Sequence, residues 1–280
     1  MSVEELAPAK INLALHVRAR RNDGYHALET LFAFLAHGDS VRVAPADLPS
    51  FNLIGPFGAA LAASGAAGDD NLVTRAAAAF TARFGGGPWA ITLDKHLPVA
   101  SGIGGGSADA AATLRACARL SGIAVDAPGL FAIAESLGAD VPACLLGHSA
   151  IGTGKGEQLV PVAGVSGIPV LLVNPGVAVS TAAVFRGWDG VDRGALGTGT
   201  LLERAKAGRN DLEPSARAIA PVIGDVVARL EALPGVMLAR MSGSGATCFA
   251  LFEDARACAD AGAAVRVAKP DWWCLESALA

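Results

Sequence analysis

The residues with the clearest chemical potential form a glycine- and serine-rich stretch near the middle of the chain. Four glycines and two serines stand between Leu97 and Ala108, and an alanine-rich segment follows as far as Gly122. Glycine allows positive φ and lets a ligand approach the backbone closely, whereas alanine has the highest helix propensity. We therefore expect a loop that leads into a helix over Ala108–Ser121, with Gly122 as its C-terminal stop. The free N–H groups and the positive end of the helix dipole would then bind an anion such as phosphate.

Two common phosphate-binding motifs do not fit this stretch. A P-loop requires Lys and then Ser or Thr directly after its last glycine, but Gly106 is followed by Ser107 and Ala108. The dinucleotide pattern G-x-G-x-x-G fails at its third position, where Gly102 and Gly104 lead to Ser107. A flexible linker or a plain helix entry remains the structural alternative, although the helix-forming run behind the glycines argues against it.

The segment PVASGIGGGSA at 98–108 resembles the ATP loop of the GHMP kinases, most closely in the branch whose substrate is a cytidine diphosphate-linked methylerythritol. Ala100-Ser101 departs from a common glycine pair, and Ala108 departs from a common second serine. Both replacements are small and keep the loop's shape, but position 108 loses a hydroxyl that could hold phosphate or metal. The resemblance implies that the cofactor ATP is bound by the whole loop: Pro98, Val99, Ala100, Ser101, Gly102, Ile103, Gly104, Gly105, Gly106, Ser107 and Ala108.

A second motif, PAKINL, stands at residues 8–13. Apolar side chains alternate with other residues over 11–17, which predicts a half-buried strand. On this basis alone Lys10 would be a solvated strand end. However, P-A-K-x-N-L resembles the first motif of the GHMP kinases. The resemblance implies that Lys10 stabilises the reacting hydroxyl and phosphate, and that Asn12 contacts the substrate.

The segment GADVP at 138–142 supplies a candidate for the second catalytic residue. An Asp that follows a glycine helix stop and precedes a proline is usually a turn residue. The segment nevertheless resembles the one that carries the catalytic base of these kinases. Phosphoryl transfer to an alcohol needs positioning, charge neutralisation and an acceptor for the hydroxyl proton. A Lys ammonium keeps a nearby carboxylate ionised, so we expect Lys10 and Asp140 to be the catalytic pair.

The tetrapeptide DGYH at 23–26 selects the branch of the family. Asp-Gly predicts a turn, and Tyr25 and His26 follow it directly. An aromatic ring can stack on a pyrimidine while an imidazole bonds to its edge; the alternative is that Tyr25 covers a core edge and His26 is polar surface. The tetrapeptide resembles the diphosphocytidyl branch, which implies that Thr181 and Phe185 also bind substrate, Phe185 opposite Tyr25. An aromatic residue on a helix is more often part of the core.

Three further features belong to the expected site. Asp70-Asn71-Leu72 are expected to start a helix that runs to about Phe84, with Asp70 or Asn71 as its cap; this Asn lies near the nucleotide in the family, although a cap needs no ligand. Lys95 directly precedes the ATP loop and is also assigned to the cofactor. The segment MSGSGAT at 241–247 resembles the third GHMP motif, a second glycine-rich loop that lies against the first.

Length and pattern predict an α+β protein with two domains. A chain of 280 residues suits two domains, which we place at 1–158 and 159–280. The resemblance implies the two-domain GHMP kinase fold, with an N-terminal ATP-binding domain like ribosomal protein S5 domain 2 and a C-terminal ferredoxin-like domain. A strand is expected over 264–267, and the Gly/Ala-rich residues 55–68 are expected to form a mobile excursion.

Composition limits the class of partner. Hydrophobic residues make up 52% of the chain and charged residues 17%, as in a compact soluble protein. The net charge of −4 and the absence of basic clusters argue against nucleic acid. No apolar run has membrane-spanning length and no leader pattern is present, which predicts a cytoplasmic protein without membrane contact. The five scattered cysteines are expected to be reduced core thiols.

Together these resemblances imply a kinase that uses ATP to phosphorylate the 2-hydroxyl of 4-diphosphocytidyl-2-C-methyl-D-erythritol in non-mevalonate isoprenoid biosynthesis, as a monomer or weak homodimer. Mg²⁺ is expected because ATP is used, and Ser107 or Asp109 could help to hold it. One alternative is another small-molecule GHMP kinase, such as a homoserine or mevalonate kinase, which the expected pyrimidine pocket disfavours. The other is a non-catalytic nucleotide sensor, which would be expected to lack the catalytic pair.

Overall fold

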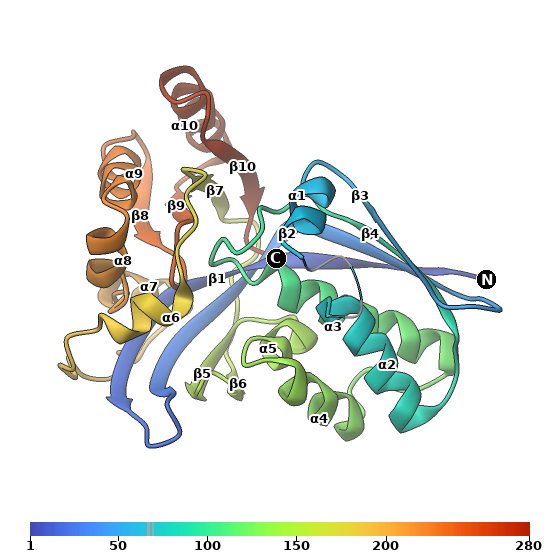
Figure 1. Ribbon diagram of the computed structural model, residues 1–280. Coiled ribbons are helices and arrows are strands. Elements are labelled where there is room, and N and C mark those ends of the chain that lie inside the picture. The colour runs from blue at the N-terminus through green and yellow to red at the C-terminus, as the bar shows by residue number, and fades with distance from the viewer. Residues whose placement is uncertain (66–67, 69) are drawn as a thin grey trace. The chain divides into compact units, whose positions relative to one another are not determined.

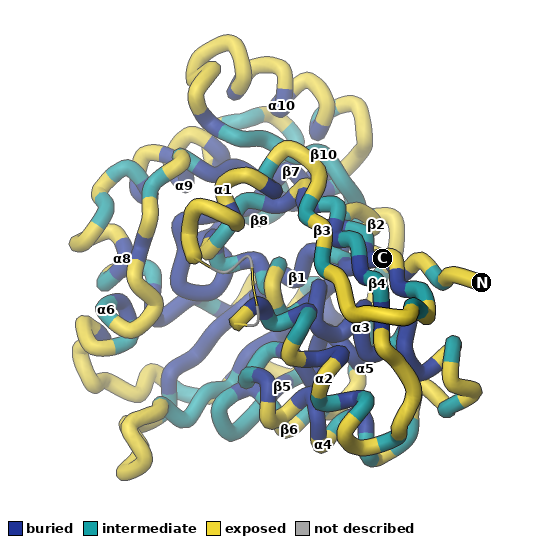
Figure 2. The backbone as a smooth tube through the Cα atoms, turned by 45° about the vertical axis from the view of Figure 1, so that its right-hand side comes forward, coloured by how far each residue is buried: buried dark blue, intermediate teal, exposed yellow. Residues whose placement is uncertain are grey.

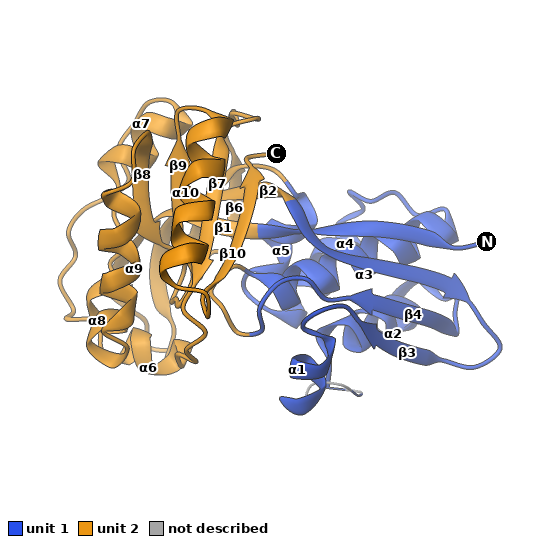
Figure 3. Ribbon diagram, turned by 90° about the horizontal axis from the view of Figure 1, so that it is seen from above, with its two compact units in different colours: residues 1–9, 37–99, 104–147 blue, residues 10–36, 100–103, 148–280 orange. Residues whose placement is uncertain are grey.

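The computed structural model describes residues 1–65, 68 and 70–280, which form two compact units. Unit 1 contains residues 1–9, 37–99 and 104–147, and unit 2 contains residues 10–36, 100–103 and 148–280 (Figure 3). This division differs from the continuous domains expected at 1–158 and 159–280. The first two strands, β1 (Val3–Arg20) and β2 (His26–Pro45), are long enough for each to contribute one end to either unit.

Unit 1 combines a small sheet with a group of helices (Figure 1). Its elements besides the ends of β1 and β2 are β3 (Ser50–Ile54), α1 (Gly58–Ala63), α2 (Leu72–Phe84), β4 (Trp89–Asp94), α3 (Gly105–Ser121), α4 (Pro128–Leu137) and α5 (Val141–Leu146). Strand β4 pairs antiparallel with the end of β2 and parallel with β3. Helix α3 packs against α2, α4 and α5. Within the excursion expected at 55–68, α1 is helical, whereas residues 66 and 67 lie outside the described residues.

The alanine content of α3 is explained by its burial. All the residues from Ala108 to Leu114 are buried, as are Ala116, Cys117 and Ala118. A helix buried on nearly all sides needs short side chains so that its neighbours can approach closely. Alanine meets this need and also favours the helical backbone.

In unit 2, β1 is buried on both faces rather than on one, so the prediction of a half-buried strand over 11–17 was wrong. Residues 9–17 are buried throughout, as Figure 2 shows for the middle of β1. The polar side of the strand is covered by residues near 194 and 209, because His16 Nδ1 lies 2.9 Å from the Gly194 carbonyl oxygen and His16 Nε2 accepts the Arg209 N–H at 3.3 Å. Alternation in the sequence could not reveal that a distant segment would cover the second face.

Unit 2 also holds two sheet regions and the helices of the C-terminal half. Its elements are β5 (Ala150–Gly154), β6 (Gln158–Pro161), β7 (Pro169–Asn174), α6 (Thr181–Arg186), α7 (Leu201–Ala207), α8 (Glu213–Ile219), α9 (Val222–Glu231), β8 (Val236–Met241), β9 (Cys248–Phe252), α10 (Ala255–Ala268) and β10 (Trp273–Ala278). Strand β5 pairs with residues 28–32 of β2 and with β6. The second sheet has the order β10-β7-β9-β8, with α9 and α10 packed against its strands.

This second sheet has the β-α-β-β-α-β element pattern of a ferredoxin-like fold, as the sequence predicted. The strand expected over 264–267 was wrong, because those residues continue α10. Cys258, Ala261, Gly262 and Val265 are its buried residues, and their spacing is helical. None of the helices in the described part of the chain combines the length and apolar character needed to cross a bilayer.

Candidate active site

The first candidate region is the N-terminus of α3 in unit 1. The helix begins at Gly105, three residues before the expected start at Ala108, so the last glycines of the loop already form a helical turn. Gly104 precedes it with a left-handed φ of 67°, and no side chain caps this end. The first N–H groups of a helix have no acceptor within the helix itself. Gly105, Gly106 and Ser107 therefore offer the backbone donors that an anion needs, without bulky side chains around them.

Ala108 stands where the family commonly has a second serine. Its place in the structure explains why no hydroxyl is needed there. Its side chain is fully buried, and its N–H donates to the Gly104 carbonyl at 2.8 Å. A methyl group that faces the interior cannot contact phosphate. The departure from the family's usual serine thus falls on a core residue in this chain.

Beneath this turn lies a buried group of charges that we call the ion cluster: Asp39, Lys95 and Asp109. The Lys95 ammonium donates to Asp39 Oδ2 at 2.5 Å and to Asp109 Oδ2 at 2.8 Å. The other oxygen of Asp39 accepts the backbone N–H groups of His96 and Leu97, at 2.5 and 2.8 Å. All three charged side chains are at most 3% exposed.

Within the ion cluster, burial and the neighbouring charges shift the pKa values of Asp109 and Lys95. Burial disfavours the charged form of Asp109, and the neighbouring Asp39 carboxylate adds to this; together they raise the pKa of Asp109 to about 7 although Lys95 opposes them. Burial also disfavours the Lys95 ammonium. Asp109 and Asp39 outweigh that effect and raise the pKa of Lys95, so this lysine stays charged at neutral pH.

The ion cluster bears on two expectations. Lys95 was assigned to the cofactor; its ammonium is enclosed by two carboxylates and the residue is 2% exposed, and its contact with the cofactor stays a prediction. Asp109 was a candidate for holding Mg²⁺, but its carboxylate is buried against Lys95. Asp39 was not singled out from the sequence, because nothing near His37-Gly-Asp-Ser40 indicates a partner 56 residues away.

Two other expected residues of unit 1 lie at helix starts. Asn71 is the N-cap of α2 and accepts the Val73 N–H at 2.8 Å, so the cap is Asn71 and not Asp70, the other predicted candidate. Asp140 directly precedes α5, and its side chain makes no capping hydrogen bond. Pro142 does not block a helix there, as the turn alternative assumed, but lies in the first turn of α5, where proline is tolerated.

In unit 2, Lys10 and Asn12 are held in a buried polar chain. Lys10 Nζ donates to Asn12 Oδ1 at 3.0 Å, and Asn12 Nδ2 donates to Thr30 Oγ1 at 2.7 Å. Lys10 is 2% exposed, so it is not the solvated strand end of the structural alternative. Asn12 therefore orients Lys10. Lys10 and Asp140 belong to different units, so their pairing stays a prediction.

The two glycine-rich loops meet within unit 2, as the resemblance implied. Ser242 accepts the Asn12 N–H at 3.1 Å and donates to the Gly102 carbonyl at 3.0 Å. The Thr247 N–H donates to Ser101 at 3.1 Å. A Cβ at Gly102 would stand 2.6 Å from the Ser242 carbonyl oxygen, and φ there is +80°, so this position requires glycine.

Ala100 has the unusual backbone of the ATP loop. Its φ of 51° makes it the single non-glycine residue with positive φ in the part of the chain that the structure describes. Left-handed backbone is disfavoured for alanine but not for glycine. This explains why a glycine pair is common at this point of the loop.

The second candidate region is an aromatic group in unit 2: Tyr25, His26, Phe185 and Trp188. The His26 ring lies 5.1 Å from that of Phe185 and 5.7 Å from that of Trp188, centroid to centroid. Tyr25 is 55% exposed, and the Lys155 ammonium lies 4.7 Å from the centre of its ring. Thr181 starts α6, and its hydroxyl lies 2.9 Å from that of Ser244. Trp188 and Lys155 were missed, although Trp188 stands close to Phe185 in the sequence.

The His26 ring packs against Phe185 and Trp188, and one of its ring nitrogens makes no hydrogen bond in the described part of the chain. Its Nε2 is buried, and neither it nor the Trp188 indole nitrogen has a hydrogen-bond partner among the described residues. Burial, with the nearby Arg20 charge, lowers the pKa of His26, which favours the neutral ring. A neutral imidazole can donate or accept at the edge of a base.

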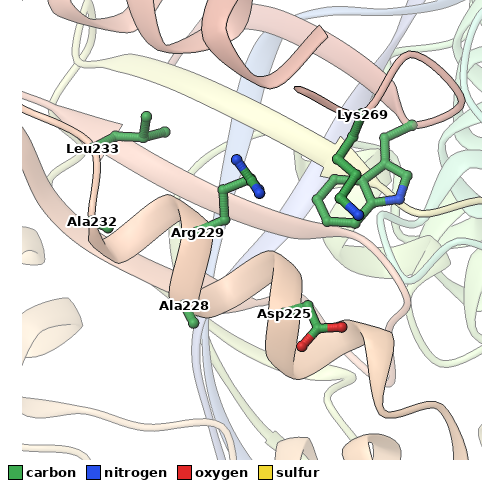
Figure 4. Close-up of a pocket in the computed structure, with 7 residues that line it drawn as sticks. Asp225, Ala228, Arg229, Ala232, Leu233 and Lys269 are labelled. Carbon is green, nitrogen blue, oxygen red and sulfur yellow. The ribbon is translucent and has the colours of Figure 1, made fainter. Parts of the chain in front are cut away.

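A hollow elsewhere in unit 2 contains none of the expected residues. It lies along α9 and is lined by Asp225, Ala228, Arg229, Ala232, Leu233, Lys269 and Trp272 (Figure 4). Lys269 covers the Trp272 ring, with 5.3 Å between ammonium and ring centre. Among the described residues, no three His, Cys, Asp or Glu side chains are grouped so as to hold a metal ion.

Comparison with known proteins places these motifs in a family context. Residues 71–148 match the model of the GHMP kinases N terminal domain, and residues 194–267 match that of the GHMP kinases C terminal domain. The chain is 55% identical to the 4-diphosphocytidyl-2-C-methyl-D-erythritol kinase of Rhizorhabdus wittichii, over 100% of this chain and 95% of that one. It is 50% identical to the same kinase of Novosphingobium aromaticivorans, over 100% and 93% of the two chains.

Solved structures agree in fold over the whole chain. A crystal structure of 4-(cytidine 5'-diphospho)-2C-methyl-D-erythritol kinase aligns with a TM-score of 0.79 and 36% identity, over 99% of both chains. Homoserine kinase from Cytophaga hutchinsonii aligns with a TM-score of 0.74, but at 19% identity, over 100% of this chain and 94% of that one. The second likeness concerns the fold alone.

Proposed function

The chain belongs to the GHMP kinase family, and on that premise we propose that it phosphorylates the 2-hydroxyl of 4-diphosphocytidyl-2-C-methyl-D-erythritol, a step of non-mevalonate isoprenoid synthesis. The observation that carries this proposal is 55% identity, along the whole chain, to a relative named as that kinase. The two-domain α+β fold expected from the sequence is confirmed by the family models and by the solved kinase structure.

The aromatic group supports this substrate over those of other GHMP kinases. A cytosine ring can stack on Tyr25 or Phe185 and accept or donate a hydrogen bond at His26 Nε2. Thr181 and Asn12 complete the proposed substrate contacts. The likeness to homoserine kinase extends to the fold but reaches only 19% identity.

GHMP kinases use ATP as the phosphate donor, and the first turn of α3 fits its phosphates. Gly104, Gly105 and Gly106 present backbone without side chains, and a Cβ at Gly106 would meet only the tip of Leu72 at 3.6 Å. Positive helix potential and free N–H groups favour an anion there. We assign the rest of residues 98–108 and Asn71 to nucleotide binding on the basis of the resemblance.

In the proposed mechanism, Asp140 accepts the proton of the substrate 2-hydroxyl while that oxygen forms a bond to the γ-phosphorus. The bond between this phosphorus and the β–γ bridging oxygen breaks, and ADP leaves with the bonding electrons. Lys10, oriented by Asn12 at 3.0 Å, stabilises the negative charge on the reacting oxygens. These roles require positioning and charge rather than a covalent intermediate.

Mg²⁺ supplies charge neutralisation on the phosphates when it is bound. The described residues fit such an ion only in part: Ser107 in the first turn of α3 could offer its hydroxyl, whereas Asp109 is buried on Lys95. We propose a cytoplasmic enzyme that acts on this small molecule as a monomer or weak homodimer. The five cysteines form no disulfide among the described residues, which suits a reducing compartment.

One assay tests the proposal. ADP release is coupled to a spectroscopic signal with 4-diphosphocytidyl-2-C-methyl-D-erythritol, homoserine or mevalonate as the acceptor. We expect turnover only with the first, and product phosphorylated at the 2-hydroxyl. Faster turnover with homoserine or mevalonate would favour the other GHMP kinases, and ATP binding without turnover on any acceptor would favour a nucleotide sensor.

A further inference from the structure

Three consecutive carbonyl groups of the ATP loop are bound within unit 2. Their donors come from β1 and from residues 241–247, which we call the motif loop: the Thr247 N–H binds the Ser101 carbonyl at 3.1 Å, the Ser242 hydroxyl binds that of Gly102 at 3.0 Å, and the Lys10 N–H binds that of Ile103 at 2.9 Å. The place of residues 101–103 therefore depends on the motif loop and on the strand that carries Lys10.

Ser242 is the residue of the motif loop that contacts both the strand and the ATP loop. Its hydroxyl accepts the Asn12 N–H at 3.1 Å and donates to Gly102, and the residue is fully buried. A Cβ built on the next residue, Gly243, would stand 3.3 Å from Asn12 Oδ1, the oxygen that accepts Lys10 Nζ. The position of the motif loop thus decides where Asn12 lies with respect to Gly102.

The side chain of Asn210 binds the motif loop on both sides of Ser242. Its Nδ2 donates to the carbonyl oxygens of Met241 and Gly243, each at 2.8 Å, and its Oδ1 accepts the Leu212 N–H at 3.0 Å. Asn210 is 6% exposed, so these bonds are formed away from water. Two donors on one nitrogen therefore fix the backbone before and after Ser242.

The backbone on either side of Asn210 pairs with β1. Leu15 donates its N–H to the Arg209 carbonyl at 2.8 Å and accepts the Asp211 N–H at 2.9 Å. Leu15 lies three residues beyond Asn12 on the same strand. Asn210 thus connects strand and loop, because its neighbours hold β1 while its side chain holds the segment that contacts Asn12.

The contacts of Asn210 require two donors and one acceptor in a short side chain. Backbone carbonyls accept hydrogen bonds and cannot donate them, so both groups that face the amide nitrogen require a donor. Asp has the size of Asn but only oxygen atoms at this place, and its carboxylate would repel the two carbonyl oxygens. Buried carbonyls that lose their donor are costly to the fold.

We propose, on the basis of the function proposed above, that Asn210 is a positioning residue for the catalytic strand and the ATP loop. Through Ser242 it sets the place of Asn12, which orients Lys10. Through the same hydroxyl it sets the place of residues 101–103. Loss of its two donors should lower turnover and ATP affinity together and spare binding of the cytosine, which is proposed to involve the aromatic group.

The test compares Asn210→Asp with the parent in kcat, in KM for each substrate and in Kd for ATP by calorimetry. The substitution keeps the volume and the acceptor for Leu212 but removes both donors. We expect kcat to fall about 10²-fold and Kd for ATP to rise about tenfold, since small displacements of positioned groups have effects of this size. KM for the cytidine acceptor should stay within about threefold. A folded Asn210→Asp protein with kcat and Kd for ATP within about threefold of the parent would overturn the proposal.

Asp211→Asn is the matched control, since it changes the neighbouring buried residue of the same segment. Asp211 accepts the Val17 N–H at 2.8 Å and a side-chain N–H of Arg209 at 2.7 Å. Asparagine there weakens the attachment of β1 but leaves the motif loop its contacts. We expect a lower melting temperature, with kcat and Kd for ATP within about threefold of the parent. Equal losses of kcat in Asn210→Asp and Asp211→Asn would mean that both residues only support the fold.

Ser242→Ala keeps the proposal testable if Asn210→Asp does not fold. It removes the hydroxyl that joins Asn12 to Gly102, while both donors of Asn210 stay in place. The same pattern is expected, with a fall in kcat and a rise in Kd for ATP of about tenfold each and an unchanged KM for the acceptor. Values like those of the parent would contradict the proposed route through Ser242.

Failure of the proposed function would give a different result. If the parent phosphorylates none of the acceptors, Kd for ATP still tests Asn210. A rise in Asn210→Asp but not in Asp211→Asn would then keep the positioning role for the ATP loop and remove the kinase assignment. Normal turnover and ATP binding in Asn210→Asp would remove the positioning role and keep the kinase assignment.

Discussion

The start of α3 and the aromatic group, the two regions proposed to bind ATP and the cytosine base, offer opposite kinds of groups to a ligand. Under the start of α3, the charged side chains are buried and paired with one another, and the donors left for a ligand belong to the backbone. In the aromatic group, Tyr25 is exposed, and two ring nitrogens, His26 Nε2 and Trp188 Nε1, have no partner among the described residues. In the proposed function, phosphate recognition would depend on a fixed framework, whereas recognition of a base would depend on side chains whose ring groups have no partner in the described part of the fold.

This contrast has a functional consequence. Changes at the start of α3 should alter ATP binding, changes in the aromatic group should alter substrate binding, and changes in the catalytic pair should alter turnover alone. Each substitution below tests whether one of these three effects occurs without the other two.

The largest effect is expected for Asp140→Asn. The substitution keeps the size of the side chain and its ability to form turns but removes the proton acceptor. We expect kcat to fall by roughly 10²–10⁴-fold, with both KM values within a few-fold of the parent because the lost interaction belongs to the transition state. Thermal stability should hardly change, since the side chain caps no helix. A kcat within a factor of about three of the parent's would leave Asp140 as a turn residue.

A loss of ATP affinity is expected for Gly105→Val. The new Cβ would stand 3.0 Å from Lys95 Nζ, so the side chain presses into the ion cluster. We expect at least a tenfold rise in Kd for ATP by calorimetry and a destabilisation of about 1–3 kcal/mol from overpacking, with KM for the acceptor unchanged.

Gly106→Ala serves as the stability control for Gly105→Val, because its Cβ would make only an ordinary contact of 3.6 Å with Leu72. Alanine there should hold or raise the melting temperature. If Gly105→Val binds ATP like the parent, the phosphates do not lie at this turn, and the contrast between the two regions loses its basis.

Local chemistry explains what the sequence could predict. Glycine and alanine have strong backbone preferences of their own, so the loop and the helix behind it followed from residue types alone. The cap of α2 was narrowed to Asp70 or Asn71 in the same way, and the structure shows Asn71. The helix start was placed at Ala108 rather than Gly105 because glycine is a poor helix former, and propensity does not reveal what a ligand site requires. The DGYH tetrapeptide indicated Tyr25 and His26 because a turn and two rings are adjacent in the chain.

The remainder depended on contacts between distant residues. Asp39 binds Lys95 from 56 positions away, and no local pattern distinguishes it from a surface aspartate. Trp188 packs edge-on against His26, although the two residues are 162 positions apart in the sequence. The second face of β1 is covered by residues near 194 and 209. Such pairings are set by the tertiary fold, which periodicity over a short window does not contain.

A moderate and selective effect is expected for Tyr25→Ala. Loss of one aromatic stacking partner should weaken binding of the cytidine substrate by about 1–3 kcal/mol, while Kd for ATP stays within twofold. Tyr25 is 55% exposed, so stability should change little. An equal loss of affinity for both ligands would mean that the ring supports the fold, and the aromatic group would no longer be a separate recognition region.

The smallest effect is expected at Ala100, where the ATP loop has a left-handed backbone at φ 51°. Ala100→Gly relieves about 1–2 kcal/mol of backbone strain but restores about 0.4–1 kcal/mol of freedom to the unfolded chain, so the free energy of unfolding should change by less than about 1.5 kcal/mol. Kd for ATP should stay within threefold, because the loop already has the shape that glycine prefers. Ala100→Val is the matched counterpart, since a β-branched residue is a clear outlier at positive φ; it should weaken ATP binding while substrate binding is kept. If Val is tolerated as well as Gly, the loop does not need this backbone to bind the nucleotide, and the fixed framework would be confined to the ion cluster and the first turn of α3.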